Sequence, residues 1–277
     1  MPAHRAPMAR LWRRALPHAV CVAAAMLAAP AAAADLAPAP APTAPSAVKD
    51  ADAPVFFGTA YLWGSALSGT TSTLPPLPAA DVDLSFADIL KHFDGGIMGA
   101  VEMRTGRWST IVDAMFTQVS PGATLPGPFA SSIELRSRTL TLQGDVLYRL
   151  YESDALDVDV GAGLRFWQLG NKISIGPGLL PVGITFEETQ GWADPLVAAR
   201  ISARLGGPWS LTVFGDIGGL GLGSQVTWQV FSTVNYQWNE ALALRLGYRA
   251  LAVDYEKGAF LYDVLMQGPV IGATYRF

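Results

Sequence analysis

Apolar and polar side chains alternate with a period of two along most of the chain between residue 54 and Phe277. The segment 226–238 shows this most clearly, with apolar and aromatic residues at most even positions and hydroxyl or amide residues at most odd positions. Successive side chains of a β-strand point to opposite faces. The alternation therefore predicts strands that have one apolar face and one polar face.

Ten segments follow this pattern: 55–66, 96–104, 108–119, 133–151, 156–169, 185–205, 209–219, 226–238, 241–255 and 260–277. The connections after the second, fourth, sixth and eighth segments have only two to four residues, and most of the others are longer. Short turns at one end and longer loops at the other are typical of transmembrane barrels. We predict an all-β fold, a closed antiparallel transmembrane β-barrel of about ten strands, or of eight if one of the first two segments lies outside the wall.

Aromatic side chains gather where the apolar faces meet the short turns. A soluble β-sandwich would also alternate, but it gives no reason for rings at this depth, whereas a membrane barrel carries an aromatic girdle at the lipid interface. The predicted girdle consists of Trp108, Tyr148, Trp209, Tyr236, Trp238, Tyr275 and Phe277.

The first 34 residues have the features of a secretory signal peptide, which would be removed from the exported chain. A basic region with four arginines precedes an apolar stretch at 20–29, and the alanine run 31–34 offers a cleavage site. The Pro/Ala-rich stretch 35–53 is expected to be an extended periplasmic linker. Residues 54–277 are then the barrel domain.

Charge and cysteine content exclude several classes of function. The single cysteine, Cys21, lies in the signal peptide, so the mature chain has no cysteine chemistry. Without the first 34 residues, 15 basic side chains face 23 acidic ones, which gives a net charge of −8 and argues against nucleic-acid binding.

Three stretches resemble a broad, uncharacterised family of Gram-negative outer-membrane β-barrel proteins, of the kind of the small OmpA and OmpW barrels. They are GWADPLVAAR at 191–200, GYRALAVDY at 247–255, and the ending from Tyr262 to Phe277, with SFADIL at 85–90 as a further match. The resemblance covers about residues 55–277. It implies that the chain is exported and forms a barrel in the bacterial outer membrane. It does not imply an activity.

The alternation places eight acids and eight arginines inside the barrel. This lumen charge network consists of Glu102, Arg104, Asp113, Asp145, Arg149, Asp157, Asp159, Arg165, Asp194, Arg200, Arg204, Asp216, Arg245, Arg249, Asp263 and Arg276. Guanidinium groups pair well with carboxylates, and charges away from bulk water require partners. Since ten strands enclose a narrow bore, we expect a filled interior, with a selectivity-lining pore as the alternative.

We predict no catalytic residue, no metal site and no cofactor. The mature chain has one histidine, His92, and it falls in the first long loop, away from the strands where barrel lipases carry a Ser/His pair. Acids near the rim leave an outer-rim hydrolase or a cation site as an alternative hypothesis; they are Glu187, Glu188, Asp254, Glu256 and Asp263.

Two further features lie near the longer loops. Residues 85–93 predict a short amphipathic helix with a capping box at Ser85 and Asp88 and an end at Gly95-Gly96. We expect it to rest over the barrel mouth, with a position against lipid as the alternative. By parity, Glu134, Arg136 and Arg138 point outward above the lipid-facing residues, where the arginines would meet lipopolysaccharide phosphates, unless a bulge turns them inward.

These patterns lead to three functional hypotheses. The first is a monomeric outer-membrane protein with a structural or interaction role and a filled lumen, the second a narrow porin-like channel for small solutes, and the third the rim hydrolase. The expected partners are outer-membrane lipid, lipopolysaccharide and the barrel assembly machinery. The assembly machinery is expected because the ending Thr-Tyr-Arg-Phe277 is similar to the assembly signal of such barrels.

Overall fold

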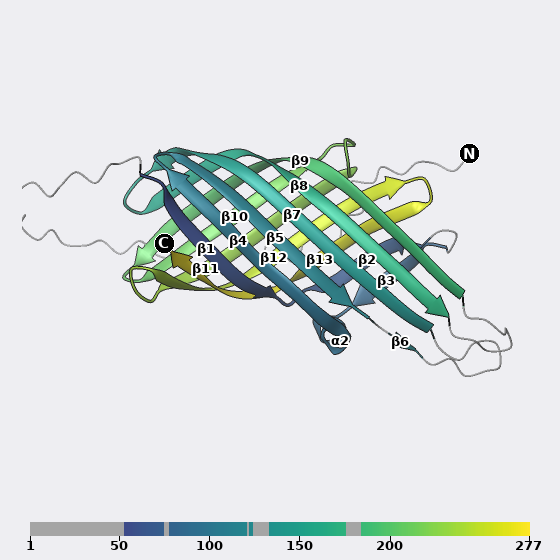
Figure 1. The fold of residues 1–277 in the computed structure, drawn as a ribbon. Coiled ribbons are helices and arrows are strands. Elements are labelled where there is room, and N and C mark those ends of the chain that lie inside the picture. Colours follow the sequence, from purple (N-terminus) through teal and green to yellow (C-terminus); the bar gives the residue numbers. More distant parts are fainter. Residues whose placement is uncertain (1–52, 75–77, 121, 124–132, 176–183) are drawn as a thin grey trace, which may run out of the picture.

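The computed structural model describes residues 53–74, 78–120, 122–123, 133–175 and 184–277. The predicted signal peptide and nearly all of the predicted linker lie outside these ranges. The described chain is a closed cylinder of tilted antiparallel strands (Figure 1).

Ten strands form the wall, and each pairs antiparallel with its neighbour in the order of the chain, while the pairing of the first with the last closes the cylinder. This confirms the predicted fold class and its larger strand count. The strands are β1 (Val55–Trp63), β4 (Phe93–Thr105), β5 (Trp108–Val119), β7 (Ile133–Glu152), β8 (Leu156–Ile175), β9 (Ile184–Gly206), β10 (Trp209–Gly219), β11 (Val226–Gln237), β12 (Leu242–Lys257) and β13 (Phe260–Arg276).

The first predicted segment is interrupted at residues 64–65, between β1 and the next strand, although the Gly64 backbone N–H still donates to the Pro269 carbonyl oxygen at 2.9 Å. Pro269 on β13 has no backbone N–H to donate to the ladder, and a Cβ on Gly268 would lie 2.0 Å from the Gly64 carbonyl oxygen. The chain resumes pairing with β13 as β2 (Ala66–Ser72), which pairs in turn with β3 (Ala80–Leu84). A two-residue strand, β6 (Gly122–Ala123), pairs with β7.

The predicted helix is present as α2 (Phe86–Lys91). The Ser85 hydroxyl caps it by accepting from the Asp88 backbone N–H, and it donates to the Asp88 carboxylate at 2.6 Å, which lowers the pKa of Asp88. Two details differ from the prediction. The helix is capped at His92 and runs into β4 at once, and it lies beside the wall instead of over the mouth (Figure 1).

The outer surface of the wall is apolar. Leu62, Ile97, Leu164, Val197 and Leu246 are each more than half exposed, on five different strands. A soluble monomer rarely exposes so continuous an apolar surface, whereas a membrane barrel needs one as its lipid-facing band. Among the described helices, none is long and apolar enough to cross a membrane.

The two ends of the cylinder differ. We call the turn end the one where β4–β5, β7–β8, β9–β10 and β11–β12 are joined by two to four residues, and where the C-terminus lies. The opposite loop end carries the longer connections, except for the two residues between β12 and β13. This asymmetry agrees with the one predicted.

Candidate functional site: the filled lumen

The interior near the turn end holds a network of ion pairs between strands. Arg200 on β9 donates to Asp159 on β8 at 2.6 Å and to Glu102 on β4 at 2.6 Å. Arg104 approaches the same Glu102 with two nitrogens at 2.7 and 3.0 Å, and Arg149 donates to Asp159 at 2.9 Å. These five side chains link four strands.

Arg165 forms the centre of the next layer and is fully buried. Its Nη2 lies 2.7 Å from both carboxylate oxygens of Asp216, its Nη1 donates to Thr227 at 2.9 Å, and its Nε donates to Gln143 at 3.0 Å. Gln143 in turn donates to Asp145 at 2.9 Å. Charge-assisted hydrogen bonds of this kind are about twice as strong as neutral ones. The layer fills this part of the lumen with side chains that hydrogen-bond to one another, although Asp145 Oδ1 is enclosed without a partner.

Arg249 crosses the lumen at the same depth from β12. It donates to Gln229 at 2.7 Å and to the Tyr61 hydroxyl at 2.8 Å, and it lies 3.4 Å from Asp113, which Tyr61 also contacts. The guanidinium carbon lies 5.1 Å from the centre of the Trp63 ring, within the range of a cation–π contact.

The interior toward the loop end is aromatic and apolar instead of charged. Trp192 is stacked between Trp167 at 5.8 Å and Tyr255 at 3.9 Å, and Trp167 is fully buried. The rest of this layer consists of Trp63, Met115, Leu169, Leu251, Val253, Phe260, Tyr262, Val264, Met266 and Val270. We call it the aromatic layer, and its side chains fill the bore above Arg165.

The structure places the remaining predicted lumen residues in different surroundings. Asp194 is buried and accepts from the Ser224 backbone and hydroxyl at 2.6 and 2.8 Å. Arg204 reaches the turn end, where it donates to Asp157 at 2.9 Å. Arg276 faces inward at the turn end and is exposed.

Asp263 is not in the lumen. The register of β13 with β12 has no shift, so Asp263 lies on the opposite face from Tyr262 and Val264, which pack in the aromatic layer. The prediction for this residue was wrong because it assigned the acid by its charge, against the alternation of its own strand.

Sequence reasoning missed the uncharged members of the lumen. Gln143, Gln229 and Thr227 complete the hydrogen bonds of the two buried arginines, and Trp167 and Trp192 form the aromatic layer. The sequence contained a signal for the two tryptophans. Trp167 is two residues from Arg165, and Trp192 is two residues from Asp194, so each ring lies on the same face of its strand as a predicted lumen residue.

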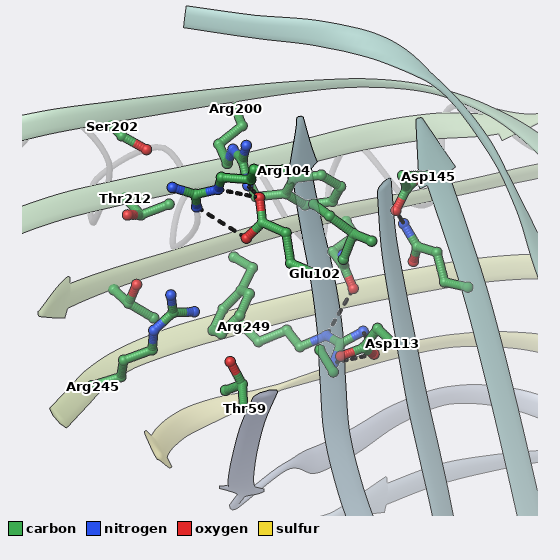
Figure 2. A pocket seen from close by; sticks show the side chains of 17 residues that line it. Thr59, Glu102, Arg104, Asp113, Asp145, Arg200, Ser202, Thr212, Arg245 and Arg249 are labelled. Atoms are coloured by element: carbon green, nitrogen blue, oxygen red, sulfur yellow. Dashed lines mark hydrogen bonds and ion pairs between the residues drawn. The ribbon is translucent and has the colours of Figure 1, made fainter. Parts of the chain in front are cut away.

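A pocket of about 110 Å³ lies among the charged side chains of the turn-end half (Figure 2). Glu102, Arg104, Arg200, Arg245 and Arg249 contribute to its wall. Arg245 is largely buried, and its Nε is enclosed without a hydrogen-bond partner. The structure therefore brings most of the predicted network together but leaves Arg245 apart from it.

The predicted girdle residues all lie at the turn end, in three sets of ring contacts. Trp108 and Tyr148 have ring centres 4.9 Å apart, and Tyr275 and Phe277 have ring centres 5.1 Å apart. The third set is Tyr236 with Trp209 at 4.8 Å and Trp238 at 6.2 Å.

A second polar feature lies on the outside of the wall near the loop end. Arg136, Arg138 and Lys172 line a groove of about 290 Å³ with Phe116 and Leu140, and we call the three cations the outer-face basic patch. No register shift separates them from Leu142, so Arg136 and Arg138 point outward as the alternation predicts. Two neighbouring acids approach the patch loosely, Glu134 at 3.8 Å from Arg136 and Glu187 at 3.7 Å from Lys172.

His92 is the C-cap residue of α2, and the rim acids Asp254 and Asp263 are cross-strand partners on β12 and β13. The His92 ring nitrogen Nδ1 contacts the Asp88 carbonyl oxygen at 3.0 Å, next to the helix cap. Within the described ranges, no three His, Cys, Asp or Glu side chains form a group that would hold a metal ion.

No protein-family model and no curated protein matches the sequence. Among solved structures, the chain is similar to Neisserial surface protein A, at 14% identity over 80% of this chain and 97% of that chain, with a TM-score of 0.28. It is also similar to Ail, the attachment invasion locus protein of Yersinia pestis, at 11% identity over 82% and 99%, with a TM-score of 0.33. The translocator domain of the autotransporter NalP from Neisseria meningitidis matches at 11% identity over 80% and 88%, with a TM-score of 0.37.

Proposed function

We propose that the chain is a bacterial outer-membrane β-barrel protein that conducts no solute and acts through its surfaces. The observation that carries this proposal is the blocked lumen. Arg165, Thr227, Trp167 and Leu251 are all fully buried inside the cylinder, so the polar layer and the aromatic layer each block the bore.

Conductance across planar lipid bilayers tests this proposal. The purified barrel is expected to insert without producing discrete current steps in concentrated potassium chloride. Steps of constant size that scale with the number of inserted molecules would replace the proposal with the channel hypothesis. Insertion itself is checked by protease protection in vesicles of the same lipid.

A narrow channel is the second candidate, and the polar pocket of the turn-end half favours it. This pocket is the part of the described interior where a small hydrophilic solute would fit. It borders Gln143, Gln229 and Arg249, which belong to the polar layer, so a solute would have to displace buried ion pairs to go further. We therefore prefer the non-conducting barrel to the channel as the proposed function.

For partners, we propose outer-membrane lipid along the apolar wall and lipopolysaccharide phosphate at the outer-face basic patch. The patch lies just above Leu140 and Leu142, where an outer-leaflet headgroup would meet the wall, and its own acids pair with it only loosely. Guanidinium groups bind phosphate oxygens with two parallel hydrogen bonds. Replacing Arg136, Arg138 and Lys172 together by Gln should reduce the lipopolysaccharide that remains bound after detergent extraction, and unchanged retention would contradict the assignment.

A further inference from the structure

Arg245 stands apart from the other lumen arginines because it has no ion-pair or hydrogen-bond partner among the described residues. It lies on β12 between Asn235 of β11 and Gly272 of β13 and faces the turn-end pocket. Figure 2 shows its guanidinium directed into the pocket without a contact, while Arg104 and Arg249 are bonded. A cation removed from bulk water without a counterion is costly.

The acids that line this pocket are already engaged elsewhere. Glu102 is shared by Arg104 and Arg200, and Asp113 is held by Tyr61 and Arg249. Asp145 accepts from Gln143 with Oδ2, while its Oδ1 is enclosed without a hydrogen-bond partner. Asn235, the cross-strand neighbour of Arg245, uses its carbonyl oxygen to accept from Thr233. Among the described residues, none of these acids forms a hydrogen bond or an ion pair with Arg245, whose Nε is enclosed without a partner.

The pocket also contains hydroxyl donors and is open to a small solute. Thr212 accepts a hydrogen bond from Asn235 at 3.1 Å, so its own proton is available to a further acceptor, and Ser202 lies in the same wall. The volume of about 110 Å³ is roughly that of three or four water molecules. Arg104, which is 38% exposed, marks where the pocket meets solvent at the turn end.

We propose that this pocket binds one small oxyanion, such as inorganic phosphate or a short carboxylate, with Arg245 as its counter-charge and the hydroxyls of Thr212 and Ser202 as further donors. A planar guanidinium fork suits two oxygens of one anion. The anion enters from the turn end and stops below the polar layer. The site does not depend on whether the barrel conducts.

Isothermal titration of the detergent-folded barrel with inorganic phosphate tests the site, with sodium chloride adjusted to keep ionic strength constant. The wild-type protein is expected to bind phosphate at one saturable site, and its melting temperature to rise with phosphate. Arg245→Met should weaken phosphate binding by about tenfold to a hundredfold, as for the loss of a hydrogen bond to a charged group. The matched control is Arg107→Gln, an exposed arginine in the first short turn, which should bind phosphate like the wild type.

The melting temperature without phosphate distinguishes an anion site from a solvated arginine. In phosphate-free chloride buffer, Arg245→Met should melt at or above the wild-type temperature, because an uncompensated charge has been removed. Three results would overturn the proposal: no saturable phosphate binding by the wild type, equal binding by Arg245→Met, or an equal effect of chloride. If Arg245→Met does not fold, Arg245→Lys takes its place, with reduced phosphate affinity expected from the lost fork.

Discussion

Arg165 on β8 and Asp216 on β10 meet inside the cylinder with Nη2 at 2.7 Å from both carboxylate oxygens, and neither side chain is exposed. The two strands are not neighbours, since β9 lies between them. The pair therefore joins parts of the wall that share no backbone hydrogen bonds, and Gln143 and Thr227 hold the same guanidinium from two more strands.

The first prediction concerns this pair. Arg165→Ala leaves Asp216 as an uncompensated buried charge, which should lower the free energy of unfolding by about 3 to 5 kcal/mol. The matched control is Arg136→Ala, whose pair with Glu134 is half exposed on both sides and should contribute about 0 to 1 kcal/mol. Urea unfolding followed by tryptophan fluorescence measures both variants, and equal losses would show that water reaches the lumen layer.

The second prediction concerns the aromatic layer. Trp192→Ala removes the ring between Trp167 and Tyr255 and should destabilise the barrel by about 3 to 5 kcal/mol. The variant should still conduct no current, because the Arg165 layer remains below it. Planar bilayer recordings check this, and open steps from Trp192→Ala alone would show that the aromatic layer is the only barrier.

The third prediction concerns assembly. Deleting Phe277 removes a ring that packs on Tyr275 and lies over Gly58, and it also removes the terminal aromatic that is similar to the assembly signal. The amount of folded protein in the outer membrane should fall severalfold, as measured by heat-dependent migration on gels. Phe277→Tyr keeps an aromatic end and should restore normal levels. Unchanged levels of the deletion variant would contradict the role of this residue.

The fourth prediction concerns the fold in solution. The protein in detergent should show a β-type circular dichroism spectrum and should migrate faster on gels before heating than after it. A predominantly helical spectrum, or identical migration in both states, would contradict the closed barrel.

The sequence predicted the wall well because alternation is strict where one face meets lipid and the other a packed interior. The predicted bounds 108–119 and 209–219 are those of β5 and β10. The interruption after Trp63 was missed, since it depends on Pro269, which lies opposite Gly64 and more than two hundred residues away in the sequence. The lumen was predicted as charged throughout because only ionisable side chains were assigned to it. Trp167 was left out although it lies on the same face of its strand as Arg165. No local pattern shows that Arg245 lacks a partner, because partners come from strands distant in sequence.

The end of β1 at Trp63 also bears on the order in which the cylinder assembles and on where it opens first. Seven residue pairs join β1 to β13 and six join β1 to β4, whereas sixteen join β12 to β13. The bond between Thr59 and Thr274 spans 215 positions, so the loop entropy of this contact is among the largest in the chain. β1 is therefore expected to join the wall last during folding and to detach from it first, and amide hydrogen exchange should be faster in β1 than in the other wall strands.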